Sequence, residues 1–223
     1  MFAHTDFETN GRAWFRNAVP PADLERLAKS FPADGRAGDR PATDSEAAHY
    51  FAGPNPVSDI AAVLGLAPAP VRLAVFDKSP QTNWAVPWHQ DRVIAVTGRH
   101  DMPGYRNWLP KDGYWHVEPP PEILQDMVFV RVHLDAADET NGCLQLALGS
   151  HRSGVVSSSD ASSLANSLPI ENCIAAPGDV LVVKALTLHR SASSAAASRR
   201  RAIRIDYVDR LALPPPLQWA LPA

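Results

Sequence analysis

The chain has little cysteine, because Cys143 and Cys173 are the only two among 223 residues. A single pair cannot supply the disulfide framework of a small secreted domain, so we expect two buried thiols and a reducing, cytoplasmic location. The first residues, MFAHTDFETNGR, lack the basic start and the apolar stretch of a secretory signal. These features argue against a disulfide-rich or secreted protein.

Long apolar runs and an excess of positive charge are also missing. No apolar run in the sequence reaches the roughly 20 residues that span a bilayer. The 21 Lys and Arg against 24 Asp and Glu leave a net charge of -3. The basic run SRRRAIR (198–204) is too short to indicate a nucleic-acid surface. We therefore expect a small-molecule substrate and neither a membrane nor a nucleic acid as partner; the sequence leaves the oligomeric state open.

What remains is the composition of an ordinary globular protein, with 45% hydrophobic and 20% charged residues. A chain of this length can bury a sizeable core, so we expect residues 1–223 to form a single domain. The first part, 1–70, is predicted to be mainly helical, because PPADLERLAKSF (20–31) and NPVSDIAAVLGLAPAP (55–70) carry helical start signals and spacing. The last part, 209–223, is predicted to be a proline-rich tail that drapes over the domain.

Between these parts, residues 71–208 change to the pattern of β-strands. Segments rich in β-branched and apolar residues are separated by turn residues, as in ETNG and APGD. The predicted strands are 71–77, 86–96, 127–135, 143–148, 179–186 and 202–208. Short strands joined by turns predict an all-β core with flanking helices, for which a jelly roll is the natural arrangement.

Two connections within this core are unusual. GYRNWLPKDGYWHV (104–117) is longer than a hairpin requires and rich in aromatic residues. It is predicted to be a lid or pocket wall or, alternatively, a packed loop over one end of the barrel. SSSDASSLANS (157–167) is rich in serine and is predicted to be a mobile surface loop.

A histidine and an aspartate stand one residue apart in NWAVPWHQDRVIAV (83–96), whose apolar, β-branched flanks predict a strand. Side chains at i and i+2 of a strand point to one face, so His89 and Asp91 would point together into the core. A carboxylate there is costly unless it is paired or bound to a metal. His189, in LVVKALTLHRS, is the best third candidate, because two histidines and one carboxylate on one side of Fe(II) leave the opposite positions open.

An arginine follows His189 at a distance of eleven residues. Arg200 lies near the start of the next predicted strand, where its side chain can reach into the barrel. A guanidinium binds a carboxylate through two parallel hydrogen bonds, and a dicarboxylate that chelates iron through its 2-oxo-acid end needs such an anchor at its far end. The neighbouring Arg199 and Arg201 leave the choice open by one position, and the spacing from His189 favours Arg200.

Four stretches together resemble the phytanoyl-CoA dioxygenase family of Fe(II)- and 2-oxoglutarate-dependent oxygenases. They are FDKSPQTNWAVPWHQD, VRVHLDAADETNGCLQLALGSHRSG, APGDVLVV and LTLHRSASSAAASRRRAIRIDYV, in family order. The resemblance implies a cupin-like double-stranded β-helix (jelly roll), with His89, Asp91 and His189 as iron ligands. It also implies that Arg200 holds the distal carboxylate of 2-oxoglutarate. Family members usually have a proline before Gly-Ser-His where this chain has LALGSH, a difference that affects no predicted ligand.

Other residues are candidates for the walls of the site. Arg131 lies on a strand where family members place a residue that contacts the cosubstrate; alternatively, Arg131 faces the surface while Val130 and Val132 pack in the core. Lys78 is a second cosubstrate candidate, with a solvated turn lysine as the alternative. Candidate substrate contacts are Trp88, Trp115 and His116, although tryptophans also simply pack.

The resemblance implies an enzyme that uses O2 and 2-oxoglutarate to hydroxylate a C–H bond of a small molecule, with release of succinate and CO2. Asp91 disfavours halogenation, because related halogenases lack this carboxylate and chloride takes its place. One alternative is a metalloenzyme with the same triad but no 2-oxoglutarate. A second alternative is a non-catalytic jelly-roll protein that binds a metal or a small molecule. The sequence does not identify the substrate.

Overall fold

The computed structural model describes residues 2–32, 37–39, 45–66, 70–111, 113–196 and 198–221. Its largest element is an antiparallel sheet in the order β1-β11-β8-β13-β3-β2. The strands are Arg12–Phe15 (β1), Val180–Lys184 (β11), Val128–His133 (β8), Arg200–Tyr207 (β13), Pro70–Lys78 (β3) and Gly38–Asp39 (β2). The predicted strands at 71–77, 127–135, 179–186 and 202–208 are therefore neighbours in one sheet.

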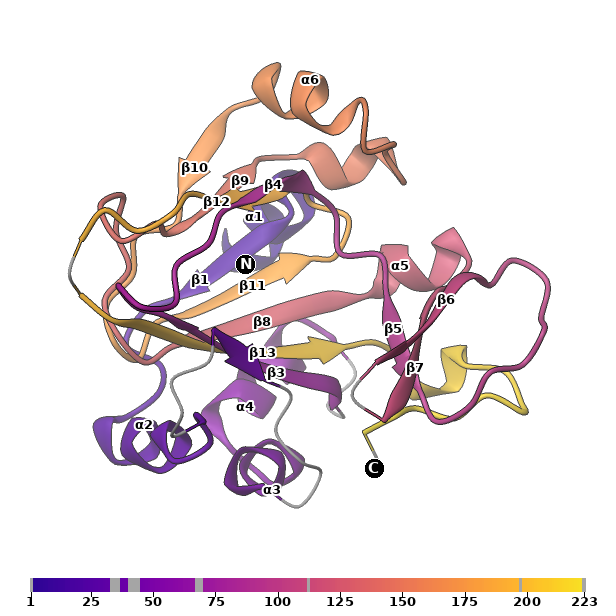
Figure 1. Ribbon diagram of the computed structural model, residues 1–223, viewed down its shortest axis with the longest axis horizontal. Coiled ribbons are helices and arrows are strands. Elements are labelled where there is room, and N and C mark those ends of the chain that lie inside the picture. Colours follow the sequence, from indigo (N-terminus) through magenta and orange to yellow (C-terminus); the bar gives the residue numbers. More distant parts are fainter. Residues whose placement is uncertain are drawn as a thin grey trace.

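A smaller antiparallel sheet lies across from the large one (Figure 1). Its order is β10-β9-β12-β4. The strands are Ile170–Asn172 (β10), Leu144–Ala147 (β9), His189–Ser191 (β12) and Val86–His89 (β4). Two facing antiparallel sheets, in which strands distant in sequence pair with one another, form a jelly roll. The predicted all-β core with flanking helices is confirmed.

Helices cover the face of the large sheet that points away from the small sheet (Figure 1). They are α2 (Pro21–Ala28), α3 (Glu46–Ala52) and α4 (Pro56–Val63). Asn55 starts α4 with a capping box, because its side chain accepts from the N–H of Ser58 while the Ser58 hydroxyl accepts from the N–H of Asn55. The remaining helices are α1 (Phe2–Asn10), α5 (Pro121–Asp126), α6 (Ala161–Asn166) and the 3-10 turns Ser150–Ser153 (η1) and Arg210–Ala212 (η2).

The helical prediction for the N-terminal part is confirmed in α2 and α4, although residues 67–69 at the end of the second predicted helix lie outside the described residues. The same part also contributes β1 and β2, which the sequence did not predict. Both are short edge strands, and four residues or fewer carry no clear alternation.

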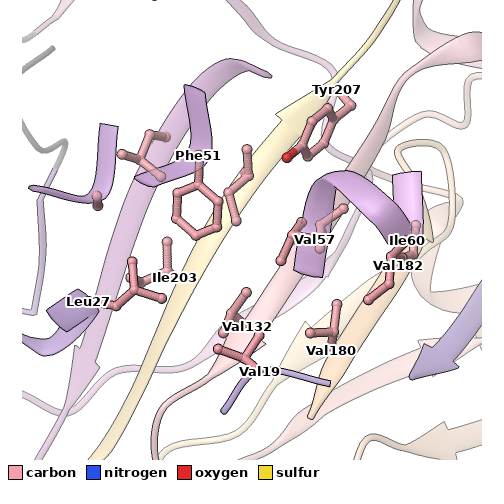
Figure 2. Packing of buried hydrophobic residues seen from close by; sticks show 14 of the residues in the cluster. Val19, Leu27, Phe51, Val57, Ile60, Val132, Val180, Val182, Ile203 and Tyr207 are labelled. Carbon is pink, nitrogen blue, oxygen red and sulfur yellow. The ribbon is translucent and has the colours of Figure 1, made fainter. Parts of the chain in front are cut away.

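The main apolar core lies between these helices and the large sheet (Figure 2). It includes Leu27, Phe51, Val57, Ile60, Val130, Val132, Val180, Val182, Ile203 and Tyr207. The other face of the sheet is covered by the small sheet, so every residue of β8 is buried. Both alternatives for this strand were therefore partly right: Val130 and Val132 pack in the core, while Arg131 lines the space between the sheets and does not reach the surface.

A third sheet corrects the prediction of a lid or loop at 104–117. Its order is β5-β7-β6, with the strands Ile94–Val96 (β5), Tyr114–Glu118 (β7) and Arg106–Lys111 (β6). The aromatic stretch is a hairpin, and the rings of Trp108 and Trp115 meet edge to face with centroids 6.3 Å apart. Its length is explained by two paired strands and a turn, which stack aromatic side chains on one face.

The proline-rich tail drapes over this third sheet, as predicted. Trp219 forms an isolated bridge with Val96 at the edge of β5. Leu217 and Trp219 are buried in a second apolar cluster that includes Ile94 and Val117. The tail therefore completes a small core of its own beside the jelly roll.

Two further predictions need correction. The predicted strand 86–96 is two strands, β4 and β5, which belong to different sheets and are joined by residues 90–93 without a ladder. The serine-rich stretch 157–167 contains helix α6, whose Ala161 and Ala165 are buried against Trp88. Within the described parts of the chain, none of the helices has the length and apolar character to cross a membrane.

Candidate active site

Three side chains meet on the inner face of the small sheet. His89 ends β4 and His189 begins β12; the two are direct cross-strand partners, with ring centroids 4.2 Å apart. Asp91 follows on the same chain segment, and Nε2 of His189 lies 3.1 Å from its Oδ2. One potential ligand atom from each of the three residues lies within 4.8 Å of the other two. The structure therefore brings the three predicted metal ligands together.

The backbone fixes the orientation of both imidazoles. Nδ1 of His89 is 2.9 Å from the carbonyl oxygen of Pro87, and Nδ1 of His189 is 2.9 Å from that of Thr187. A carbonyl oxygen only accepts, so Nδ1 is the donor in each of these contacts, and Nε2 is the nitrogen left to bind a metal. This is the usual arrangement of metal-ligating histidines. Two such nitrogens and one carboxylate fit an Fe(II) ion with open positions.

Asp91 reaches the site by a different route from the one predicted. β4 ends at His89, so the strand alternation invoked for His89 and Asp91 does not extend to the carboxylate. The chain turns after His89, and the N–H of Asp91 donates to the carbonyl oxygen of Ala185 at 3.2 Å. The two side chains converge because of this turn.

The charges around the triad favour the forms that bind metals. Burial alone would raise the pKa of Asp91, but the nearby Arg204 and His189 outweigh it and hold this pKa well below its usual value. Nη1 of Arg204 donates to Oδ2 of Asp91 at 2.5 Å. Burial, followed by the proximity of His189, lowers the pKa of His89. The carboxylate is therefore ionised and this imidazole neutral near pH 7.

The triad lines a cavity of about 170 Å³ between the two sheets. Its apolar walls include Phe76, Trp84, Val86, Phe129 and Leu144. Three arginines, Arg131, Arg200 and Arg204, supply its other charged side chains from the large sheet, whereas Arg190 and Ser191 belong to the small sheet. The cavity is therefore a chamber with the possible metal ligands on one wall and guanidinium groups on the other.

Two of the arginines that line the cavity, Arg200 and Arg131, lie close to a buried lysine, Lys78, which is not itself among the lining residues. Lys78 is 0%, Arg200 3% and Arg131 8% exposed, and Lys78 is the direct cross-strand partner of Arg200. Lys78 Nζ donates to the carbonyl oxygen of Ala192 at 2.6 Å, and Arg200 Nε donates to that of Asn141 at 3.2 Å. Nε of Arg131 has no partner in the described part of the chain. Among the residues that the structure describes, no Asp or Glu forms an ion pair with any of the three.

This uncompensated charge perturbs the cations themselves. Burial, followed by repulsion from Arg200, lowers the pKa of Arg131 to about 9. Burial, followed by repulsion from Arg200 and Arg131, lowers the pKa of Lys78 to about 8. Burying charges without counter-ions is costly. The wall is therefore arranged to receive an anion, whose arrival would relieve both the repulsion and the desolvation.

The neighbours of Arg200 point the other way. Arg199 pairs with Asp77, and Arg201 pairs with Asp135 through two nitrogens at 2.8 and 2.9 Å. Alternation along β13 therefore leaves Arg200 as the member of the arginine run that lines the cavity. The position that the spacing favoured is the one whose side chain reaches the chamber.

The three candidate substrate contacts lie elsewhere. Trp88 is buried on the outer face of the small sheet beside α6, because it alternates with His89. Trp115 packs with Trp108 in the third sheet, and His116 is buried in the same sheet. None of the three is among the residues that line the cavity. The tryptophan that does line it is Trp84, whose ring lies 4.9 Å from Nζ of Lys78.

Arg204 was not singled out from the sequence. It stands four residues after Arg200 on β13, so both side chains point to the same face. The even spacing of these two arginines in RRRAIRIDY (199–207) could have indicated from the sequence that Arg204 faces the same side as Arg200. Its partner Asp91 could not be inferred, because the contact depends on the turn that follows His89.

A jelly roll that holds two histidines and a carboxylate beside an open cavity is suited to mononuclear non-haem iron chemistry. The family model described as phytanoyl-CoA dioxygenase matches residues 7–202. The chain belongs to the phytanoyl-CoA dioxygenase family.

Solved structures share the fold at low sequence identity. AviO1 from Streptomyces viridochromogenes Tue57 is 22% identical, with 96% of each chain covered and a TM-score of 0.64. EctD from S. alaskensis, solved with 2-oxoglutarate and 5-hydroxyectoine, is 16% identical over 92% of this chain and 74% of that chain, with a TM-score of 0.68. EvdO2 from Micromonospora carbonacea var. aurantiaca, complexed with 2-oxoglutarate, is 17% identical over 92% and 89%, with a TM-score of 0.61. No curated protein sequence matches the chain.

Proposed function

We propose that the chain is an Fe(II)- and 2-oxoglutarate-dependent dioxygenase that hydroxylates a C–H bond of a small molecule, with release of succinate and CO2. Family membership supports the class of reaction. The observation that carries the proposal for this chain is the pairing of two half-sites across one cavity. His89, Asp91 and His189 offer metal ligands on one wall, and the other wall carries Arg131 and Arg200, for which the described residues supply no carboxylate partner.

The roles of the residues follow from their positions. His89, Asp91 and His189 would hold Fe(II), which supplies the activation of O2 when it is bound. Arg200 would bind the distal carboxylate of 2-oxoglutarate, with Lys78 and Arg131 adding positive charge beside it. Phe76 and Phe129 would exclude water from the chamber. Asp91 occupies the third ligand position, so we expect oxidation and no halogenation.

Solved structures with this fold include SnoN, described as an epimerase, and SnoK, described as a carbocyclase, both from nogalamycin biosynthesis. Their descriptions indicate that this fold serves reactions other than hydroxylation. Product analysis with a turned-over substrate distinguishes the outcomes, because hydroxylation adds one oxygen atom from O2 and the other two outcomes add none.

An anaerobic titration tests the cosubstrate directly. Protein loaded with Fe(II) is titrated with 2-oxoglutarate and followed by visible absorption, and succinate is measured after O2 is admitted. We expect saturable binding and slow formation of succinate. Metal binding without any effect of 2-oxoglutarate would instead support the alternative of a 2-oxoglutarate-independent metalloprotein.

Metal analysis tests the triad. We expect Asp91→Ala to lose iron, because the substitution removes the only carboxylate ligand and the two histidines alone cannot complete the site. The matched control is Asp135→Ala, which removes a carboxylate that pairs with Arg201 outside the cavity. Retention of stoichiometric iron by Asp91→Ala would argue for a non-catalytic binding protein.

We further propose that residues 1–223 act as one domain, since the N-terminal strand β1 pairs with β11 and the tail packs against β5. We also propose a cytoplasmic location, which the two unpaired and buried cysteines support.

A further inference from the structure

The segment that carries Asp91 belongs to no sheet and is held mainly by side chains, beside one backbone hydrogen bond from Asp91 to Ala185. Residues 90–93 join β4 to β5 and belong to no ladder. On one side, the amide of Gln90 makes three hydrogen bonds of 2.7, 2.8 and 2.8 Å to backbone groups of neighbouring loops. A carboxylate on an irregular segment has no strand to fix its direction, so other contacts must do so.

On the other side, a chain of alternating charges reaches this segment. Nη1 of Arg204 donates to Asp91 at 2.5 Å, and Nε of Arg204 donates to Asp206 at 2.6 Å. The second oxygen of Asp206 lies 2.5 Å from Nε of Arg72. Arg72 in turn donates from Nη1 to the carbonyl oxygen of Val93 at 3.3 Å. Two guanidinium groups joined by one carboxylate therefore hold both the Asp91 side chain and the backbone two residues further on.

The register of the large sheet builds this chain of charges. Arg204 and Asp206 are two residues apart on β13 and share a face, and Asp206 is the direct cross-strand partner of Arg72 on β3. Asp206 is fully buried and Arg204 is buried. Buried ion pairs often stabilise a fold no more than apolar residues of the same volume. Stability alone therefore does not account for these charges, whereas a need to fix the direction of Asp91 does.

We propose that Arg204, backed by Asp206 and Arg72, is a positioning residue that orients Asp91 for metal binding. The inference rests on the proposed function, because it takes Asp91 as an iron ligand. Nη1 of Arg204 donates to Oδ2 of Asp91, the same oxygen that lies 3.1 Å from Nε2 of His189. Arg204 therefore fixes the carboxylate at the oxygen that faces the histidine.

Charge and position predict different outcomes for two variants. If charge alone mattered, Arg204→Gln would bind a divalent cation more tightly and Asp206→Asn would bind it more weakly, since the two substitutions change the local charge in opposite directions. If position matters, both variants bind it more weakly, because both loosen Asp91. The sign of the effect of Arg204→Gln therefore decides between the two.

The experiment titrates metal-free protein with Mn(II) alone, and electron paramagnetic resonance reports the free ion. We expect the affinity of Arg204→Gln and of Asp206→Asn to fall by about 10-fold or more, as when the outer partner of a metal ligand is lost. The matched control is Arg201→Gln, which removes an ion pair from the adjacent residue of β13 outside the cavity and should stay within about twofold of the parent. The visible spectrum of the Co(II)-loaded protein should change in Arg204→Gln and match the parent in Arg201→Gln.

Equal or tighter Mn(II) binding by Arg204→Gln would overturn the proposal. If that variant does not fold, Arg204→Lys replaces it, because a single ammonium keeps the charge but cannot bridge Asp91 and Asp206; parent-like affinity there would overturn the proposal equally. Failure of the parent protein to bind Mn(II) would instead overturn the metal centre on which the proposed function rests.

Discussion

Arg200 and Lys78 lie directly opposite each other on β13 and β3, both buried, and no described carboxylate pairs with either. Two like charges at facing positions of a sheet repel each other and destabilise the pair. This repulsion destabilises the folded protein, and a bound anion is expected to offset it. We therefore expect 2-oxoglutarate to stabilise the fold as well as to take part in the reaction.

Arg200→Gln should weaken the binding of 2-oxoglutarate by at least about 30-fold, because loss of the partner of a buried charged group costs about 2–5 kcal/mol. The measurement is the anaerobic titration of the Fe(II)-loaded protein. Arg201→Gln is the control on the same strand and should bind 2-oxoglutarate as the parent does. Parent-like affinity of Arg200→Gln would place the distal carboxylate elsewhere.

The affinity for 2-oxoglutarate should fall as the pH rises above about 8, because the lowered pKa of Lys78, about 8, removes its charge from the free protein there. Binding then requires uptake of a proton. Lys78→Met should lower the affinity at pH 7 and remove this part of the pH dependence. Lys184→Met, which removes a lysine paired with Glu8 outside the cavity, should leave the pH profile unchanged.

Lys78 should also affect stability, with a sign that is fixed by linkage. In the unfolded chain Lys78 keeps its proton up to about its ordinary pKa of 10.5, whereas in the folded chain its pKa is about 8. The destabilising contribution of the buried charge is thus fully present below pH 8 and disappears as the pH rises towards 10.5. In chemical denaturation, the gain in the free energy of unfolding of Lys78→Met over the parent should therefore be largest at pH 7. A gain that grew with pH would contradict this.

Gly142→Ala should destabilise the protein and disturb the cation wall. Gly142 has a φ of +70°, and an added Cβ would lie 2.3 Å from the carbonyl oxygen of Ala192 and 3.1 Å from Nζ of Lys78. Gly113→Ala is a matched control, since its φ of +81° carries the same backbone strain with nothing within 4 Å. We expect Gly113→Ala to lose about 1–2 kcal/mol and Gly142→Ala about 1–3 kcal/mol more from the clash. Thermal and chemical denaturation measure the difference, and equal losses would contradict the clash.

Substitution of the two tryptophans near His89 should affect different properties, stability for Trp88 and 2-oxoglutarate binding for Trp84. Trp88→Ala empties a buried site beside α6 and should lower the free energy of unfolding by about 3–5 kcal/mol, with little change in 2-oxoglutarate affinity of the folded protein. Trp84→Ala should lower the free energy of unfolding less than Trp88→Ala does, because Trp84 is only half-buried, yet weaken 2-oxoglutarate binding severalfold, since its ring lines the cavity and lies beside Lys78. The assignment would be wrong if Trp88→Ala weakened 2-oxoglutarate binding and Trp84→Ala caused the larger loss of stability.

The central strands of the large sheet could be predicted from the sequence because both of their faces are buried, so they read as continuous β-branched runs. β12 could not, since His189, Arg190 and Ser191 form a strand only through pairing on both sides. The hairpin of β6 and β7 was missed because proline and glycine within GYRNWLPKDGYWHV indicate a loop. Tertiary pairing overrode these local signals.

Within the site, the identities of His89, Asp91, His189 and Arg200 could be proposed from motif spacing, and the structure places all four around one cavity. The geometric reason given for His89 and Asp91 was wrong, because β4 ends between them. The network behind Asp91 could not be predicted, since it requires the register that sets Asp206 opposite Arg72. Sequence patterns report which residue types are present, whereas side-chain networks depend on pairing across strands.

Strand β8 gives alternate residues to two separate compartments, with Phe129 and Arg131 in the cavity and Val130 and Val132 in the helix-covered core. An engineer could therefore vary Phe129 to change the shape of the cavity, while keeping Arg131, the candidate cosubstrate contact, and both valines unchanged. Variants of this strand would then alter the cavity and keep the contacts that the two valines make in the helix-covered core.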